Sequence, residues 1–247
     1  YKAWQLQIDG DKLTEPHPLF VGYAESPDGI HWSKRNLGLY EFDGSKKHNI
    51  VCVGEGEEQK GCHGFAPFKD ENPDCPPEMR YKAVGAQRRA CRNGLYALVS
   101  DDAIHWRLLQ EEPIITVGAF DSQNLVFWDS VRGEYRAYVR DFREGRRCIR
   151  TAVSEDFLKW TEPEWLETRS ADAADPEAVR SALEDVDAVI QVIGVAPSLI
   201  RMITPINVFS KTTAVLVSEM ARAGVQRLMA VTGFGAGDSR RALSLPE

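Results

Sequence analysis

The side chains best suited to chemistry in the first two thirds of the sequence stand in one short run, residues 120–124 (FDSQN). Asp121 supplies a carboxylate, and the amides of Gln123 and Asn124 both donate and accept hydrogen bonds, so the run offers partners for hydroxyl groups. Arg140 follows within a β-rich stretch and can pair with a carboxylate or with a hydroxyl. Whether these groups meet depends on the elements that carry them.

Composition divides the chain into two regions near residue 167. Six Trp, seven Tyr and ten Phe are present, yet only Phe209 and Phe234 follow Glu167. All Trp, Cys and His residues lie in the first region, whereas the second is rich in Ala and Val. One uniform fold rarely segregates residue types in this way. We therefore expect an aromatic-rich module over residues 1–167 and a separate module over 168–247.

Charge and hydropathy exclude several classes of partner. The net charge is −7, and neither region has the excess of Lys and Arg typical of a nucleic-acid surface. The longest apolar run, residues 188–195, is far shorter than the roughly 18 residues of a membrane span. We expect neither a nucleic-acid nor a membrane partner. The chain begins at Tyr1 without Met, which indicates a truncated N-terminus, so compartment and oligomeric state stay open.

Cysteine usage indicates free thiols. Five Cys is an odd number, and no C-x-x-C pair is present. We therefore predict no metal site and expect thiols that pack as small apolar side chains. A single bridge between Cys62 and Cys75 stays open.

The first module contains an internal repeat. The pattern Ser-x-Asp-x-φ-x-Trp, in which φ is an apolar residue and x varies, occurs at residues 26–32, 100–106 and 154–160. A Tyr, a basic residue and an Ala precede each copy, beginning at Tyr1, Tyr81 and Tyr135. Two elements recurring in the same order indicate repeated structural units. We interpret the Ser and Asp as holding backbone N–H groups in a tight turn that the Trp covers, hence as structural residues.

Each repeat is predicted to form antiparallel strands, because side chains alternate with period two between turn residues. The expected strands of the second repeat cover 62–68, a run from Tyr81, 95–99 and 106–109; those of the third cover 121–128, 135–140, a run ending at Ser154 and a run after Trp160. Asp70 and Asp129 fall at equivalent positions and are interpreted as turn residues. Four strands per repeat are typical of a propeller blade, and the first repeat begins at its second strand.

Several runs of the first module resemble the glycoside-hydrolase-like five-bladed β-propellers of families 32 and 43. They are residues 23–32, 39–45, 68–73 with 80–82, 120–124 and 138–140. The resemblance implies a partial β-propeller of about three blades that needs no cofactor. It also implies recognition of a carbohydrate, or cleavage of a glycosidic bond, by carboxylates near the starts of the inner strands.

On this resemblance Asp121 is the candidate catalytic residue, because it is expected to open an inner strand and face the central funnel. Gln123, Asn124 and Arg140 are candidate substrate-binding residues, and His63 holds nearly the place of Asp121 one repeat earlier. The inner strand that carries the base or nucleophile in related enzymes is expected to be missing. Sugar binding without turnover therefore stays open beside hydrolysis.

In the second module the apolar period changes from two to 3.6. Asp175 and Pro176 predict the N-cap and first position of a helix, and residues 188–193 predict a buried parallel strand. A helix over 207–223 ending at Gly224, and a strand over 227–232, follow. The apolar stripe predicted for that helix is Val208, Thr212, Val215, Leu216 and Met220. We expect a partial α/β Rossmann-like parallel sheet, which binds ligands at the carboxyl ends of its strands.

Residues 187–190, 223–227 and 231–240 resemble the atypical short-chain dehydrogenases of the NmrA-like, NAD(P)-binding type. The resemblance implies NAD(P) as cofactor, with Gly194, Val195, Thr232 and Gly233 as the cofactor-binding residues carried over. The G-x-G-x-x-G fingerprint is absent, however, and no Tyr follows Tyr138 to form the Tyr-x-x-x-Lys pair of ordinary members.

Three functions of different class therefore stay open. The first is a glycoside hydrolase-like enzyme, and the second is a non-catalytic carbohydrate-binding or scaffold protein. The third is an NAD(P)-dependent oxidoreductase. Because both modules are predicted to be incomplete, a chimeric or truncated reading frame is a further hypothesis.

Overall fold

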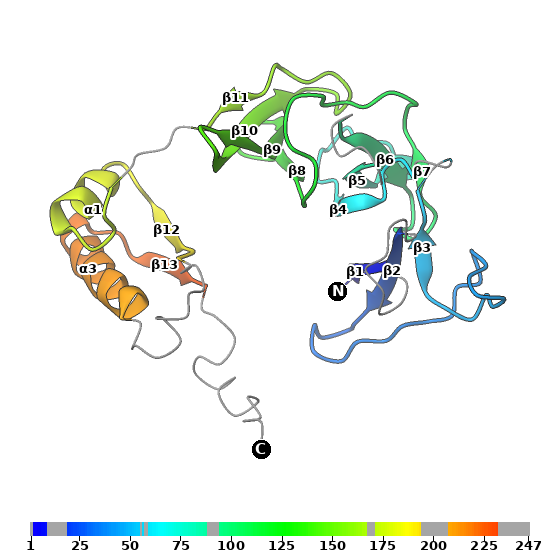
Figure 1. The fold of residues 1–247 in the computed structure, drawn as a ribbon, viewed down its shortest axis with the longest axis horizontal. Coiled ribbons are helices and arrows are strands. Elements are labelled where there is room, and N and C mark those ends of the chain that lie inside the picture. Colours follow the sequence, from blue (N-terminus) through cyan, green and yellow to red (C-terminus); the bar gives the residue numbers. More distant parts are fainter. Residues whose placement is uncertain are drawn as a thin grey trace. The chain divides into compact units, whose positions relative to one another are not determined.

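The computed structural model describes residues 19–54, 56, 59–87, 94–166, 171–193 and 207–231, together with the backbone of residues 2–8. The chain divides into two compact units, Tyr1–Glu167 and Thr168–Glu247 (Figure 1). No helix within these described ranges is long and apolar enough to cross a membrane.

The described residues of the first unit form three antiparallel sheets that follow one another in chain order (Figure 1). The first sheet contains β1 (Lys2–Ile8), β2 (Leu19–Glu25) and β3 (Ile50–Cys52). The second contains β4 (His63–Lys69), β5 (Tyr81–Ala86), β6 (Tyr96–Ser100) and β7 (Arg107–Leu108), with a short 3-10 turn at Pro77–Met79. The third contains β8 (Leu125–Asp129), β9 (Glu134–Arg143), β10 (Arg146–Ser154) and β11 (Glu164–Trp165). The predicted strands of the second and third repeats are thus confirmed in number and order.

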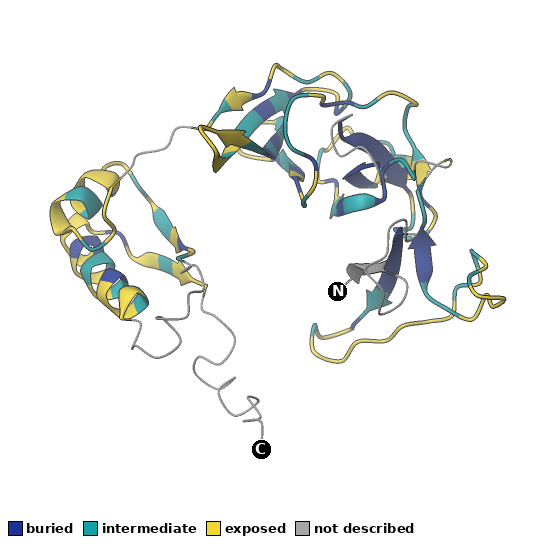
Figure 2. Cartoon of the chain, in the orientation of Figure 1, coloured by how far each residue is buried: buried dark blue, intermediate teal, exposed yellow. Residues whose placement is uncertain are grey.

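The second sheet is buried on both faces. Successive side chains of a strand point to opposite sides of the sheet, and those of β5 enter two different cores. Ala83 of β5 belongs to a core shared with Val21 of the first sheet. Its neighbour Val84 belongs to a core shared with Val126 and Ala137 of the third sheet. Figure 2 shows β5 and β6 as buried strands, whereas the third sheet carries exposed residues.

The three Ser–Asp turns share one geometry, as predicted. In the second turn Ser100 Oγ accepts hydrogen bonds from the backbone N–H groups of Asp102 and Ala103. Asp102 in turn accepts from the N–H groups of Ile104 and His105. The indole of Trp106 donates to the Ala103 carbonyl at 3.1 Å. The turns at 26–32 and 154–160 repeat the indole and Asp contacts, so these residues have structural roles.

One strand boundary was predicted wrongly, because β8 begins at Leu125 and not at Asp121. The side chain of Asn124 accepts a hydrogen bond from the Arg140 N–H at 2.8 Å and donates to the Ser122 carbonyl at 3.0 Å. These side-chain bonds take the place of the backbone ladder. Residues 121–124 therefore lie outside the strand pairing, and Asp121 precedes the inner strand.

The cysteines of the described ranges are free thiols, as expected: Cys52, Cys62, Cys75 and Cys148. The bridge between Cys62 and Cys75 is not formed. Cys62 is instead buried against the first sheet, where its thiol donates to the Leu19 carbonyl at 3.5 Å.

The described residues of the second unit form two parallel strands, β12 (Ala188–Gln191) and β13 (Arg227–Ala230), and two helices, α1 (Pro176–Ala182) and α3 (Val208–Ala223). Asp175 caps α1 by accepting from the Glu177 N–H at 3.1 Å, as predicted. Gly224 ends α3 in the left-handed conformation with φ 75°. The helices share a small core around Leu183 and Met220.

The predicted apolar stripe of α3 is wrong at one end. Val208 is 44% exposed, whereas Glu219, which was not predicted to be inside, is buried. Glu219 is buried because it accepts from Arg180 of α1 at 2.9 Å and from Arg222 at 2.6 Å. An ion-paired carboxylate can occupy a position that the pattern reserves for apolar residues.

Candidate functional site

Asp121 and Arg140 form an ion pair between the Asp121 carboxylate and the guanidinium. The Arg140 side chain, on β9, is 10% exposed, whereas that of Asp121 is 54% exposed. The guanidinium also lies over the ring of Phe142, 4.9 Å from its centroid. Within the described part of the chain, Arg140 Nε is buried and has no hydrogen-bond acceptor. An unused buried donor beside an exposed carboxylate suits a ligand group that both accepts and donates, such as a hydroxyl.

The neighbouring amides differ in their surroundings. Asn124 is buried, and both ends of its side chain are engaged, one by the Arg140 N–H and the other by the Ser122 carbonyl. It therefore positions the backbone of Arg140 beneath the ion pair. Gln123 is exposed.

His63 begins β4 in the adjacent sheet and contributes a second polar atom in need of a partner. Its Nε2 is buried and makes no hydrogen bond within the described residues. Burial lowers the pKa of His63, which favours the neutral imidazole. The next residue, Gly64, has φ +64°, and a Cβ there would lie 2.8 Å from the Ser122 carbonyl oxygen. The absence of a side chain at Gly64 thus lets the start of β4 approach the segment that carries Asp121.

The four residues predicted to bind a cofactor, Gly194, Val195, Thr232 and Gly233, lie outside the described residues. At the described carboxyl end of β12, Gln191 is buried. Its amide donates to Thr212 Oγ1 at 3.4 Å and accepts from Thr213 Oγ1 at 3.1 Å. This side chain is therefore already committed to hydrogen bonds with α3.

A buried polar cluster joins the second and third sheets and was not predicted. Asp70 accepts from the Asn72 N–H, which is the expected turn contact, but its carboxylate also pairs with Lys82 and accepts from the Tyr135 hydroxyl. Burial raises the pKa of Asp70, but the bonds from Lys82 and Tyr135 outweigh burial and lower it. Burial likewise lowers the pKa of Lys82, and the bond to Asp70 outweighs burial and raises it. The signal for this cluster in the sequence was the Tyr followed by a basic residue that recurs at the start of β5 and β9.

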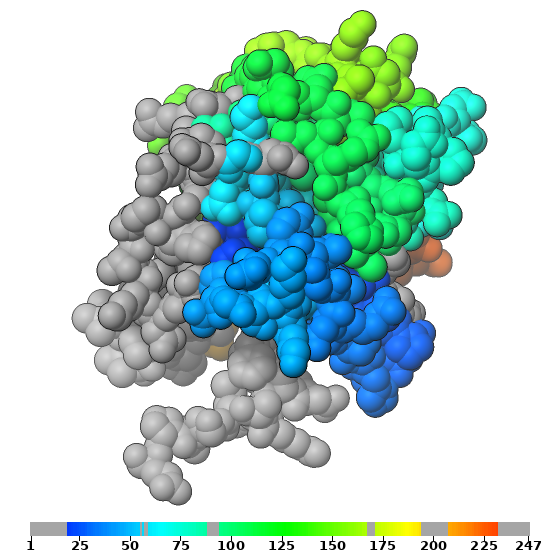
Figure 3. Space-filling model, turned by 90° about the vertical axis from the view of Figure 1, so that its right-hand side faces the viewer, coloured from blue at the N-terminus to red at the C-terminus, as the bar shows by residue number. Residues whose placement is uncertain are grey.

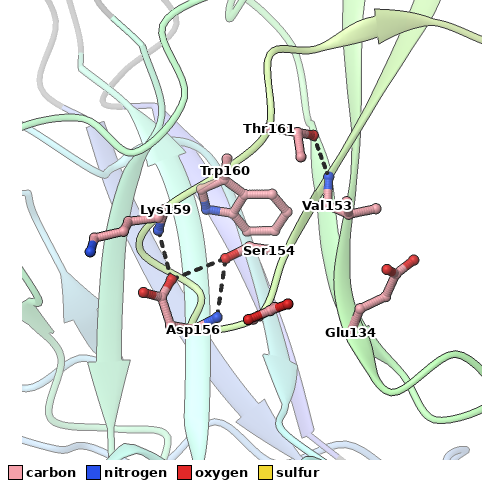
Figure 4. Close-up of a pocket in the computed structure, with 8 residues that line it drawn as sticks. Glu134, Val153, Ser154, Asp156, Lys159, Trp160 and Thr161 are labelled. Atoms are coloured by element: carbon pink, nitrogen blue, oxygen red, sulfur yellow. Dashed lines mark hydrogen bonds between the residues drawn. The ribbon is translucent and has the colours of Figure 1, made fainter.

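A hollow of about 530 Å³ lies at the third Ser–Asp turn, away from the predicted site (Figure 4). Trp160 and Glu134 are among the residues that line it, and none of the predicted site residues does so. Ser154 and Asp156 are hydrogen-bonded within the turn, and Thr161 Oγ1 accepts from the Val153 N–H (Figure 4). These polar groups therefore stabilise the turn. No three His, Cys, Asp or Glu side chains of the described ranges come together as a metal site.

Similar solved structures include the fructofuranosidase from Schwanniomyces occidentalis complexed with fructose, with a TM-score of 0.50 and 15% identity over 70% of this chain and 32% of that chain. The first unit resembles the propeller glycoside hydrolases. An N-acetylgalactosamine deacetylase from F. plautii in complex with blood group B trisaccharide has a TM-score of 0.46 and 14% identity, over 70% of this chain and 51% of that chain. This chain thus spans about half or less of the length of either structure. We refer to residues 1–167 as the propeller-like unit.

The C-terminal part of the chain matches the family model described as NAD(P)H-binding, over residues 148–246. The match begins within β10 of the propeller-like unit, where that strand pairs with β9 and β11 in an antiparallel sheet. No curated protein matches the chain.

Proposed function

We propose that the propeller-like unit binds a carbohydrate through Asp121 and Arg140, with His63 at the border of the site, and does not turn it over. The observation that carries the proposal is the buried Arg140 guanidinium, which keeps an unused Nε donor beside the exposed Asp121 carboxylate. Sugars present vicinal hydroxyls that accept from such a donor and donate to such a carboxylate. The similar fructofuranosidase was solved with fructose, which supports this ligand class.

Among the residues that the structure describes, the candidate site brings together groups that suit recognition of a sugar. Glycoside hydrolysis uses a pair of carboxylates on either side of the scissile bond. Asp121 is the carboxylate that pairs with Arg140, and the neighbouring strand start offers the half-buried imidazole of His63. A carboxylate, a guanidinium and a neutral imidazole make a set of hydrogen-bonding groups for recognition.

Isothermal titration with arabinan and fructan oligosaccharides tests the proposal. Asp121→Asn should weaken binding at least about 10-fold, because hydrogen bonds to charged groups contribute about 1.5–3 kcal/mol. Asp141→Asn is the matched control, since Asp141 pairs with Arg150 at 2.6 Å on the same hairpin. Equal affinities for wild type and Asp121→Asn, or no binding by the wild type, would overturn the site. Release of reducing sugar by the wild type would overturn the absence of turnover.

A second candidate function, NAD(P) binding by the second unit, is supported by the family match over residues 148–246. Gln191 offers no free group to the cofactor, so the proposal depends on that match alone. Addition of the protein to NADPH should change the fluorescence of the nicotinamide. An unchanged spectrum at saturating protein would exclude this function.

A further inference from the structure

Cys52 and Cys62 stand at the two ends of the connection between the first and the second sheet. Cys52 is the last residue of β3, and Cys62 directly precedes β4. Both belong to the core that the two sheets share, where Cys62 is 0% exposed and Cys52 is 4% exposed. In Figure 3 the first sheet, in blue, adjoins the cyan segment that follows it along the chain. The two thiols therefore lie together inside the unit.

The two side chains contact each other. Cys62 Sγ lies 4.0 Å from the Cys52 carbonyl oxygen, and the two thiols are hydrogen-bonded. That bond, together with burial, raises the pKa of the Cys62 thiol, which therefore keeps its proton in the folded protein. Two sulfurs in hydrogen-bond contact reach the about 2.05 Å of a disulfide by small rotations of their side chains. Cys75 has a different neighbour, because its Sγ accepts a hydrogen bond from Lys82 Nζ at 3.0 Å.

The backbone on both sides holds this pair of thiols in place. The Gln59 amide donates to the Val53 carbonyl at 2.7 Å and to the Leu19 carbonyl at 3.0 Å, which ties the connection to the first sheet. Gly61 is packed against β5, where its carbonyl occupies the place that a Cβ on Gly85 would take. Neither strand end can draw away without losing these contacts, so the fold itself brings the two thiols together.

We propose that Cys52 and Cys62 form a disulfide bond between the first and second sheets when the chain folds in the presence of glutathione disulfide. One protein thiolate attacks glutathione disulfide, which forms a mixed disulfide and releases one glutathione. The second protein thiolate attacks the protein sulfur of the mixed disulfide and releases the other glutathione. Two electrons and two protons thus pass from the protein to the two glutathione sulfurs. The reaction takes place in the folding chain, because the folded Cys62 is closed off from solvent.

Peptide mapping tests this inference, because trypsin places each of the five cysteines in a different peptide. The full chain is reduced in urea, refolded with reduced and oxidised glutathione, and alkylated before digestion. The main linked product should join residues 48–60 to residues 61–69, and the other three cysteines should be alkylated. A main linkage between Cys62 and Cys75, any other main linkage, or alkylation of all five cysteines would overturn the inference.

A bond between the two sheets should also raise the stability of the unit. A disulfide restricts the unfolded chain, so the oxidised wild type should unfold at a higher urea concentration than the reduced wild type. Cys52→Ala and Cys62→Ala should each abolish this difference, whereas Cys148→Ala, the control on β10, should keep it. Equal urea midpoints for the oxidised and reduced wild type would show that the bond does not fasten the two sheets. If a variant fails to fold, the peptide map and the midpoints of the wild type still decide.

Discussion

Tyr135 donates a hydrogen bond from its hydroxyl to Asp70 at 2.6 Å, and this bond links the third sheet to the second. The same carboxylate pairs with Lys82, and the two charged side chains are 0% and 3% exposed. Burial raises the pKa of Tyr135 to about 12, with a further contribution from the bond to Asp70. The interface between two repeats therefore contains a charged centre within an apolar core.

Loss of the Asp70 charge should destabilise the propeller-like unit. Asp70→Asn leaves the Lys82 ammonium buried without its counter-ion, which should lower the free energy of unfolding by about 3–5 kcal/mol in urea denaturation. Asp129→Asn is the control at the equivalent turn position, because its partner Arg132 is 62% exposed. There the loss should be much smaller than in Asp70→Asn, because solvent screens an exposed pair. Equal losses in the two variants would show that the buried pair is not the cause.

The same ion pair predicts a dependence of stability on pH at both extremes. The folded pKa of Asp70 is lowered, because the bonds to its carboxylate outweigh burial. Its contribution is therefore present above pH about 4, the unfolded value, and is lost as the pH falls through the folded pKa. The folded pKa of Lys82 is raised, so its contribution is present below pH about 10 and is lost as the pH rises through the folded pKa. In the wild type, urea midpoints measured across pH should fall at both acidic and basic pH. In Asp70→Asn the fall at acidic pH should be smaller. An equal fall at acidic pH in both proteins would show that Asp70 is not its cause.

A methyl group at Gly64 should disturb the candidate site. Gly64→Ala places a Cβ 2.8 Å from the Ser122 carbonyl, which must then move away from β4. Gly133→Ala is the control, since Gly133 has φ +70° and nothing within 4 Å of an added Cβ. The control should lose only about 1–2 kcal/mol of stability, which is the cost of a side chain on a residue in the left-handed conformation. Gly64→Ala should lose more stability than the control in thermal unfolding and should also weaken oligosaccharide binding. Equal losses of stability in the two variants, with unchanged binding, would show that this contact does not shape the site.

Substitution of Glu219 should lower the stability of the second unit without changing that of the first. Glu219→Gln removes a buried charge that Arg180 and Arg222 share, and should lower the local stability of α1 and α3 by about 1–3 kcal/mol. Hydrogen exchange followed by mass spectrometry should show faster exchange in both helices and unchanged exchange in β4–β6. Glu177→Gln, at an exposed position of α1, is the control. Faster exchange in the sheets of the first unit would contradict the independence of the two units.

Local patterns in the sequence were sufficient for the turns, the helix ends and the order of the strands. The buried strand predicted over residues 188–193 is wrong in part, because β12 ends at Gln191 and Ile190 is 65% exposed. Alternation with period two depends on adjacent residues, and the Ser100 turn is closed by bonds that span no more than three residues. Asp175 and Gly224 likewise act on the ends of their own helices. Such features are properties of short segments, so the sequence by itself determined them.

Only the tertiary structure decided which polar side chains are buried and which apolar ones remain open. Asp70 and Asp129 hold the same place in the repeat, yet Asp70 meets Tyr135 of the next sheet, 65 residues along the chain. The start of β8 depends on the bond that the Arg140 N–H donates to the side chain of Asn124, 16 residues away. Leu95 is 2% exposed, whereas Ile149, at the equivalent position of the next repeat, is 36% exposed. Whether a residue is buried depends on the sheet that packs against it and not on its own segment, so no local pattern could predict it.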